Sequence, residues 1–403
     1  MDFNDTPEEA AFRAESRAWL KEYAPAHVLP EGEKLDDAET VRRGKLWQKQ
    51  LADSGYAGIL LPKSLGGRGG SMAQATVFAE EEGHYRLPKG AYIIIGLGMA
   101  LPVINKHGRP EQIEKFAAPT LRGDITWCQL FSEPGAGSDL AAVRTRAIRD
   151  GDDWVVNGQK VWSSWAHQSD WGILIVRTDP SLPKHKGMTF FVVDMKTPGI
   201  DVRPIRQISG ASDFNETFFT DVRIPDTCRI GAVGEGWACA MTVLMGERLN
   251  QGGEGKEGGI ASLIQYASDT PRDGGTALDS SAIRLRLAAA YAEEQAERHF
   301  QARLRTMVSR GENPGAAASI VKLAYTNRYQ KLSGLALEMR EMAGVAHLPE
   351  DNETARIMHD YIWSTALRVA GGADEVLRNQ ISERVLGMPG EIRTDKNVPF
   401  NSL

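Results

Sequence analysis

The sequence is poor in cysteine and in long apolar runs. Cysteine occurs only three times among 403 residues, at Cys128, Cys228 and Cys239, and no two cysteines form a CxxC pair. We therefore expect neither a disulfide framework nor a thiolate metal site. The longest apolar run, residues 91–104, is shorter than the ~18 residues of a membrane-spanning helix and is interrupted by Pro102. We expect no association with membranes.

An excess of charge of one sign is also absent. The formal net charge is −6, acidic and basic residues are mixed along the chain, and no long basic run occurs. A nucleic-acid partner therefore has no support in the composition. The eight histidines lie at no metal-ligand spacing such as HxxxH, so we expect no metal site. The stretch MDFNDTPEEAAFRAESRAWL lacks the basic start and apolar core of a secretory signal, and we expect a cytoplasmic enzyme.

The patterns that are present divide the chain into three regions. Residues 1–124 have helical periodicity and begin with the capping box Thr6-Pro7-Glu8-Glu9. Residues 125–235 hold short runs of β-branched and aromatic residues between turn residues, which predicts a small antiparallel β domain. Residues 236–403 return to helical periodicity in long segments with short links, which is typical of a bundle. We predict a mainly α protein with a central β domain.

Two local patterns add detail to this scheme. Asn157-Gly158 lies between two runs rich in valine and tryptophan, which predicts a β-hairpin turn. The stretch TPRDGGTALD at residues 270–279 predicts a polar link before the first long helix of the C-terminal region.

Two motifs in the central region are candidates for binding a ligand. In LFSEPGAGSDL, residues 130–140, the glycines would let backbone N–H groups approach an anion or a ring oxygen closely. A plain turn explains the same residues. In NGQKVWSSWAH, residues 157–167, the indole of Trp162 could stack on a flat cofactor while a neighbouring hydroxyl reaches a ring nitrogen. A tryptophan packed in the sheet is the alternative.

A third motif, GERLN at residues 246–250, places a carboxylate in an apolar helix. If residues 236–250 are helical, Glu247 shares one face with Ala240, Val243 and Leu244, and this face should be buried. A carboxylate there must be paired, protonated or used in chemistry. A buried pair with a distant arginine, or a helix end at which both charges reach water, also fits.

Taken together and in order, these segments resemble the acyl-CoA dehydrogenase family. The resemblance covers almost the whole chain and is carried by WCQLFSEPGAGSDL, DGDDWVVNGQKVWSSWAHQSDWGILIVRTDP, FNETFFTDVRIP, GEGWACAMTVLMGER, RNQISERVLGMPGE and DKNVPF. It implies an N-terminal helical domain, a β-barrel-like middle domain and a C-terminal four-helix bundle, assembled as a homotetramer or as a pair of dimers. It also implies FAD as the cofactor.

The resemblance assigns roles to individual residues. The positions that bind the flavin through the FSEPGAGSD segment correspond to Gln129, Phe131, Ser132, Gly137 and Ser138. The tryptophan that stacks on the flavin corresponds to Trp162, and the residue near the reactive ring nitrogen corresponds to Ser164. Arg272, two residues out of register with an arginine of the family, is the candidate to replace that residue.

The reaction implied is the α,β-dehydrogenation of an acyl-CoA thioester to the trans-2-enoyl-CoA. A carboxylate removes the α proton while the β hydrogen leaves as hydride to flavin N5. In one branch of the family this base precedes the last helix, but here the matching positions are Ala370, Gly371, Gly372 and Ala373. In the other branch the base lies on the first helix of the C-terminal domain before an arginine, which corresponds to Glu247 and Arg248.

The chain departs from the family pattern at three flavin-binding segments, namely residues 270–279, 341–344 and 373–375. Some members of this branch share each FAD between two different subunits. We therefore also consider that this chain is the catalytic half of an α2β2 heterotetramer that acts on bulky steroid or cyclic acyl-CoA. A flavin-dependent acyl-CoA oxidase is a further alternative. Electron transfer flavoprotein is the acceptor that the resemblance implies for a dehydrogenase.

Overall fold

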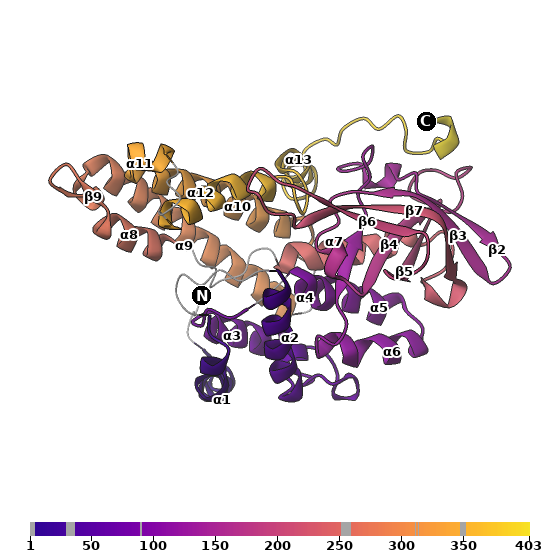
Figure 1. Ribbon diagram of the computed structural model, residues 1–403, viewed down its shortest axis with the longest axis horizontal. Coiled ribbons are helices and arrows are strands. Elements are labelled where there is room, and N and C mark those ends of the chain that lie inside the picture. Colours follow the sequence, from indigo (N-terminus) through magenta and orange to yellow (C-terminus); the bar gives the residue numbers. More distant parts are fainter. Residues whose placement is uncertain are drawn as a thin grey trace. The chain divides into compact units, whose positions relative to one another are not determined.

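The structure is a computed structural model whose contacts divide the chain into two compact units (Figure 1). It describes residues 5–29, 37–88, 91–250, 259–310, 312, 314–346 and 352–403, although some side chains inside helices fall outside this description. Unit 1 comprises Met1–Ala18, Met72–Tyr85 and Arg248–Gly390. Unit 2 comprises Trp19–Ser71, Arg86–Glu247 and Glu391–Leu403. The chain is mainly helical with one central sheet, as predicted.

The first helices form where the sequence predicts them. Helix α1 spans Pro7–Tyr23, α2 spans Asp37–Asp53 and α3 spans Met72–Glu82. The Oγ1 of Thr6 accepts a hydrogen bond from the Glu9 N–H at 3.2 Å, and the Thr6 N–H donates to Glu9 Oε2 at 2.7 Å. This is the reciprocal geometry of a capping box, which satisfies two N–H groups that the helix itself leaves without acceptors.

The strands of unit 2 form a single eight-stranded sheet with the order β6-β7-β3-β2-β4-β5-β8, and β1 pairs with β4 beside this path. Their bounds are β1 Trp127–Leu130, β2 Arg146–Asp150, β3 Asp153–Lys160, β4 Trp171–Arg177, β5 Met188–Asp194, β6 Ile200–Ile205, β7 Phe214–Pro225 and β8 Arg229–Ile230. The expectation of a purely antiparallel sheet is wrong at two pairs. Strands β1 and β2 both run parallel to β4, because residues 161–170 form a crossover after β3 instead of a hairpin.

The central strands of the sheet are buried on both faces. Alternate residues of β4 and β5 divide between two apolar clusters, with Ile173 and Phe190 in one and Leu174 and Phe191 in the other. This division follows the two-residue period of a strand. It also explains why these strands are almost continuously apolar.

Several helices lie on one side of the sheet (Figure 1), and they contribute residues to the cluster that contains Ile173 and Phe190. They are α4 Ala91–Ile95, the π-helical turn Gly96–Ala100, α5 Leu101–His107, α6 Pro110–Leu121 and α7 Gly236–Asn250. Glycine is needed at Gly246, since a Cβ there would lie 2.2 Å from the carbonyl oxygen of Gly98. The C-terminal part of α7 therefore lies directly against the π-helical turn.

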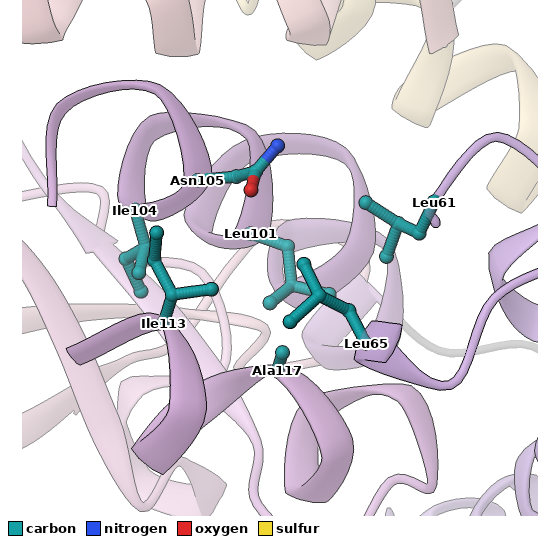
Figure 2. Close-up of a pocket in the computed structure, with 7 residues that line it drawn as sticks. All are labelled: Leu61, Leu65, Leu101, Ile104, Asn105, Ile113 and Ala117. Carbon is teal, nitrogen blue, oxygen red and sulfur yellow. The ribbon is translucent and has the colours of Figure 1, made fainter. Parts of the chain in front are cut away.

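A small apolar cavity lies between α5, α6 and the loop that carries Leu61 and Leu65 (Figure 2). The side chains of Leu61, Leu65, Leu101, Ile113 and Ala117 converge on it. Its volume is about 10 Å³, which is room for about one water molecule. It is a gap in the core and has no capacity for a substrate.

The predicted turn at Asn157-Gly158 is wrong, because these residues lie inside β3. The hairpin turn between β2 and β3 lies at Gly151, whose φ is 63°. Gly158 instead interrupts the register between β3 and β7, with a φ of 151°. A Cβ at Gly158 would lie 2.7 Å from the Thr145 Cα, so glycine is required for the close approach of two backbones and not for a turn.

Unit 1 contains the predicted helical bundle. The helices that follow α7 in this unit are α8 Ile260–Asp269, α9 Ser281–Ser309, α10 Ala318–Met339, α11 Met342–Val345, α12 Asn352–Leu367 and α13 Asp374–Arg384. Helix α10 contacts α8, α9, α12 and α13 and is the central element of the bundle. The predicted polar link before α9 is in fact a small hairpin of β9 Pro271–Arg272 and β10 Gly275–Thr276. Asp273-Gly274 forms its turn with φ values of 51° and 79°, as Asp-Gly commonly does.

Candidate functional site

The FSEPGAGSD segment continues from β1 and is fixed to β3 by a buried ion pair. The Lys160 Nζ lies 2.8 Å from Glu133 Oε1 and donates a second hydrogen bond to the Phe131 carbonyl at 2.9 Å. The carboxylate of Glu133 also accepts from the backbone N–H groups of Arg144 and Thr145, at 2.6 and 2.9 Å. One side chain pair thus holds both ends of the loop that contains residues 134–143.

The charges of this pair depend on each other. Burial disfavours the charge on Glu133, but the ion pair with Lys160 and the two backbone donors outweigh it and hold the pKa of the carboxyl below its ordinary value. Burial lowers the pKa of Lys160 to about 8, against the opposing effect of Glu133. Lys160 is completely buried, so the pair is screened very little by solvent.

The tip of the loop is open. A Cβ added at Gly135 or Gly137 would meet no atom within 4 Å, and both glycines are exposed, as is Ser138. In the part of the chain that the structure describes, the N–H groups of Gly137 and Ser138 have no protein acceptor. Unused donors of this kind, in a loop without bulky side chains, are suited to an anionic group or a ring oxygen.

Trp162 lies just beyond the end of β3 in an unusual conformation. Its side chain is 58% exposed and its φ is 61°, which is left-handed backbone that a bulky residue adopts only at a cost of about 1–3 kcal/mol. The ring makes an edge contact with Phe214 at 6.0 Å between centroids. The alternative of a tryptophan packed in the sheet is therefore wrong, since the indole presents much of its surface outside the protein core.

Hydrogen bonds to β7 and the segment before it hold this strained segment in place. The Ser163 N–H donates to the Asn215 carbonyl at 3.0 Å, and the Asn215 N–H and Nδ2 donate back to the Ser163 carbonyl at 3.1 and 2.9 Å. Trp165, whose φ is 56°, donates its N–H to the Asp213 carbonyl at 2.8 Å. His167 Nδ1 lies 3.0 Å from Asn215 Oδ1. Asn215 is fully buried, so it fixes the backbone on which Trp162 and Ser164 stand.

The structure brings several of the predicted flavin-binding residues together in unit 2. The Val161 N–H donates to the Ser132 carbonyl at 2.8 Å, which links the loop directly to the residue before Trp162. Phe131 is buried below the loop, and Ser164 is half-buried two residues beyond Trp162. Gln129 lies on β1, half-buried and paired with Ile173 of β4.

Arg272 belongs to unit 1 and is engaged in ion pairs there. Its guanidinium lies 3.2 Å from Glu341 Oε1 and 3.6 Å from Asp273 Oδ2. Two of the segments that depart from the family pattern, residues 270–279 and 341–344, are therefore in contact with each other. A role for Arg272 in binding an anion stays a prediction.

The third divergent segment carries an acid that is already neutralised. Asp374 is 1% exposed and lies 2.8 Å from Arg368 and 3.5 Å from Lys322, which is itself completely buried. The Lys322 Nζ also donates to the Gly372 carbonyl at 2.8 Å. The extra carboxylate at Asp374 thus serves the internal cohesion of unit 1, and its charge is compensated within that unit.

Glu247 and Arg248 lie in the last turn of α7. The backbone of this turn is described by the structure, but the side chains of residues 247–250 are not. The helical prediction for residues 236–250 is confirmed. Ala240 and Val243, which share the face of Glu247 in the helical pattern, are both completely buried. The backbone at Gly246 packs against the π-helical turn at Gly98, as described above.

The residues of unit 2 fit a flat heteroaromatic ring that carries an anionic chain. An exposed indole could cover a ring face, and the free N–H donors at Gly137 and Ser138 could bind a charged group. The Ser163 hydroxyl, in the residue after Trp162, is buried and has no hydrogen-bond partner in the described part of the chain. A flavin with its phosphate chain is a ligand of this kind.

Two other kinds of site are not found in the described ranges. Within them, no three His, Cys, Asp or Glu side chains come together in a group that could hold a metal ion. No helix there is both long enough and apolar enough to cross a membrane.

Sequence reasoning missed the residues that support the site. The pair Glu133 and Lys160 and the pair Asn215 and His167 each join residues far apart in the chain, with separations of 27 and 48 positions. Glu133 lies within the FSEPGAGSD motif, and Lys160 lies within a run of alternating strand residues at a position that faces inward. A lysine at an inward strand position was the one available signal.

We expect Glu133→Gln to lower the free energy of unfolding at pH 7 by about 3–5 kcal/mol, because it leaves Lys160 buried without a carboxylate. The pKa of Glu133 is lower in the folded than in the unfolded chain. The stability that its charge contributes is therefore present above the ordinary pKa of 4.5 and is lost as the pH falls through the folded pKa. Urea unfolding at pH 7 and at pH 4 should show a smaller difference between wild type and variant at the lower pH.

The matched control is Glu133→Gln combined with Lys160→Met. It removes both charges but keeps an amide oxygen that can accept from the Arg144 and Thr145 N–H groups. It should recover most of the stability lost in Glu133→Gln at pH 7, because no unpaired charge stays buried. Equal unfolding free energies for wild type and Glu133→Gln at pH 7 would contradict the structural role of the pair.

Comparison with known proteins accounts for this arrangement over nearly the whole chain. The model of the acyl-CoA dehydrogenase N-terminal domain matches residues 6–124, that of the middle domain matches residues 128–222, and that of the C-terminal domain matches residues 234–386. The three matches follow one another in the order in which the resemblance places them.

Curated relatives carry the same family name. Acyl-CoA dehydrogenase FadE34 of Mycobacterium tuberculosis is 38% identical over 386 residues, which cover 96% of this chain and 50% of the relative. This chain thus spans about half the length of that protein. Acyl-CoA dehydrogenase IpdE1 of Mycobacterium tuberculosis is 36% identical, with coverage of 95% of this chain and 98% of the relative.

Solved structures agree with the sequence relatives. The Tcur3481-Tcur3483 steroid ACAD has a TM-score of 0.81 at 28% identity, and the ChsE4-ChsE5 complex from Mycobacterium tuberculosis has a TM-score of 0.80 at 28% identity. In both cases the match covers 97% of this chain and 100% of the other. The chain therefore belongs to the acyl-CoA dehydrogenase family, whose members are FAD-dependent oxidoreductases.

Proposed function

We propose that this protein catalyses the FAD-dependent α,β-dehydrogenation of an acyl-CoA thioester to the trans-2-enoyl-CoA. The observation that carries the proposal is the exposed, left-handed Trp162 next to a glycine loop with unused N–H donors. Strain of this kind persists where the surrounding structure enforces it, and it concentrates at ligand-binding sites. Membership of the family supports the dehydrogenation reaction. The exposed Trp162 and the glycine loop support a cofactor-binding surface in this chain.

In this proposal the residues of unit 2 bind and orient the cofactor. Phe131, Ser132, Gly137 and Ser138 hold it through the loop, with Gln129 at the base of the loop. Trp162 covers one ring face and Ser164 lies near the reactive ring nitrogen. When bound, the flavin supplies a hydride acceptor at N5. The buried pair Glu133 and Lys160 keeps the loop and the end of β3 in register, so that these groups are placed before the cofactor arrives.

Glu247 is the proposed base that removes the α proton. The other position at which family members carry the base is occupied here by Gly371, which has no side chain to take this role. The helix that carries Glu247 is formed, and on the same face Ala240 and Val243 are completely buried while Leu244 is half-buried. An apolar surrounding disfavours the charged carboxylate and so favours its acceptance of a proton. We assign Arg248 the task of orienting Glu247 or of balancing its charge.

We expect Glu247→Gln to slow reduction of the bound flavin by acyl-CoA about 10²–10⁴-fold, because the amide cannot accept the α proton. Anaerobic mixing of the purified variant with an acyl-CoA thioester, followed by the loss of flavin absorbance, measures this step directly. The yellow colour of the variant before mixing should equal that of the wild type.

The matched control is Glu235→Gln, which changes the carboxylate directly before the first residue of α7, at the end of the helix opposite to Glu247. Glu235 accepts a hydrogen bond from the Ala232 N–H at 3.2 Å and has no part in the proposed chemistry. Its flavin should be reduced at the wild-type rate. Reduction of Glu247→Gln as fast as wild type would remove Glu247 from the role of base.

A heteromeric assembly is the second candidate, and three observations favour it. FadE34 is about twice as long as this chain, and the two solved structures described above are named as pairs of different chains. Three segments of unit 1 also depart from the family pattern for flavin binding. In this form the chain would be the catalytic half of an α2β2 enzyme, and a homotetramer would need no second chain.

Expression of the chain alone should distinguish these assemblies. A homo-oligomer is expected to purify yellow, with one flavin per chain by absorbance and a mass by light scattering that is a multiple of this chain. A heteromeric enzyme is expected to purify with little or no flavin and to gain it when a second chain is co-expressed. A colourless protein that gains no flavin from any added partner or from excess FAD would contradict both assemblies.

The substrate class is proposed from the same relatives. One of the solved structures is named as a steroid ACAD, so a bulky steroid or cyclic acyl-CoA is the first candidate, and straight-chain acyl-CoA is the second. Residues 251–258, which follow the helix of Glu247, lie outside the described part of the structure, so the choice between these substrates rests on the relatives. Electron transfer flavoprotein is the proposed acceptor. Formation of peroxide during aerobic turnover without an added acceptor would favour the oxidase alternative.

A further inference from the structure

The C-terminal segment of the chain, whose end is marked C in Figure 1, belongs to unit 2 and pairs with residues 180–183, which connect β4 to β5. Pro399 forms an antiparallel bridge with Pro183, the Phe400 N–H donates to the Leu182 carbonyl at 3.0 Å, and the Asn401 N–H donates to the Pro180 carbonyl at 2.9 Å. The segment is thus attached by backbone hydrogen bonds in a defined register.

Phe400 covers a buried arginine that holds the flavin loop. Arg177 is 3% exposed, and its guanidinium lies 3.9 Å from the centre of the Phe400 ring. The same guanidinium donates to the carbonyls of Ala141 and Val143, at 2.5 and 3.4 Å, and to that of Lys184 at 2.7 Å. Burial lowers the pKa of Arg177 to about 10. An aromatic face offsets part of the cost of burying such a cation.

A second contact reaches the same loop from the same segment. The Lys184 Nζ lies 2.6 Å from Asp395 Oδ2 and 2.8 Å from Asp139 Oδ2. Asp139 directly follows Ser138, whose N–H is one of the unused donors of the loop. Burial disfavours the charge on Lys184, but its hydrogen bonds to the two aspartates outweigh this effect and raise its pKa. The C-terminal segment is therefore linked to both ends of residues 139–143 through two buried cations.

We propose that the C-terminal segment 395–403 is a positioning element that clamps the flavin-binding loop through Arg177 and Lys184. The cofactor part of this inference rests on the proposed function, whereas the clamping of the loop does not. The Glu133 and Lys160 pair fixes the loop on one side, and this segment fixes it on the other. Without the segment, Glu133 would still bind residues 144 and 145 and the two cations would still reach residues 139–143, but Arg177 would lose its cover and Lys184 one of its partners.

The C-terminal segment and the buried pair of Glu133 and Lys160 act on different parts of the loop. Glu133 binds the N–H groups of residues 144 and 145, whereas Arg177 and Lys184 bind Asp139, Ala141 and Val143, which lie closer to the tip. Loss of the segment should therefore loosen the tip and leave the sheet intact. This predicts weaker cofactor binding without general unfolding.

The test compares FAD binding by full-length variants stripped of flavin. Phe400→Ala should raise the Kd for FAD about fivefold to tenfold, because the face on Arg177 is lost. Phe400→Trp restores an aromatic face and should bring the Kd back to within about twofold of wild type. Asp395→Asn removes one charge contact at a half-exposed site and should raise the Kd about twofold. Ile392→Ala, at a side chain that is 89% exposed, is the matched control and should bind like wild type.

Amide hydrogen exchange of the flavin-free proteins provides a readout that needs no cofactor. Exchange in residues 139–143 should be faster in Phe400→Ala than in wild type and should return to the wild-type rate in Phe400→Trp. Exchange in β4 and β5 should not change. Should Phe400→Ala fail to fold, Asp395→Asn gives the same comparison at lower amplitude.

The outcomes separate this inference from the proposed function. If wild type binds no FAD, either alone or with a co-expressed second chain, but Phe400→Ala still loosens residues 139–143, the clamp stands and the cofactor assignment fails. If wild type binds FAD and both variants bind it equally well with unchanged exchange in the loop, the clamp is overturned and the proposed function is untouched.

Discussion

The buried ion pair between Lys160 and Glu133 is the contact on which the candidate site depends. It joins the end of β3 to the start of the glycine loop and also holds the N–H groups at the far end of that loop. A charge pair in this position is costly to bury and specific in its geometry. A purely apolar contact would bring the same elements together without fixing their register, and the relation between the loop and Trp162 would be lost.

The strain at Trp162 and Trp165 is explained by the same requirement for position. Both residues have left-handed backbone, and the fully buried Asn215 binds the peptide between them from two directions. These hydrogen bonds hold the backbone next to Trp162 in a conformation in which its indole is exposed. Left-handed backbone at a tryptophan lowers the free energy of unfolding, so we connect this arrangement with ligand binding. The contacts of the C-terminal segment on Arg177 and Lys184 serve the same loop from the other side.

The sequence predicts the elements of this fold better than their contacts. The helix periods of α7, α9 and α10 and the strand patterns of β4 and β5 depend on local residue spacing, which a single sequence displays. The error at Asn157-Gly158 arose because glycine serves a close backbone approach there, and local pattern does not distinguish this from a turn. The parallel pairing of β1 with β4 depends on the path of the chain between them, which local residue patterns do not predict.

The candidate site was predictable only in part. Resemblance to a family named the residues that would touch a flavin, such as Trp162 and Ser138. The residues that position them, Lys160, Asn215 and Arg177, act over long distances in the chain and have no local signature. The neutralisation of Asp374 by Lys322 and Arg368 is a further case, because sequence showed an added acid but not the cations beside it.

The central claim is that the surface formed by the glycine loop and Trp162 is prepared to hold a flavin ring. A crystal structure of the protein grown with FAD tests it most directly. The account predicts electron density for the ring system against the exposed face of Trp162, with acceptor atoms of the cofactor at the N–H groups of Gly137 and Ser138. Density for FAD at any other surface, or an indole of Trp162 buried beneath the protein's own side chains, would contradict it.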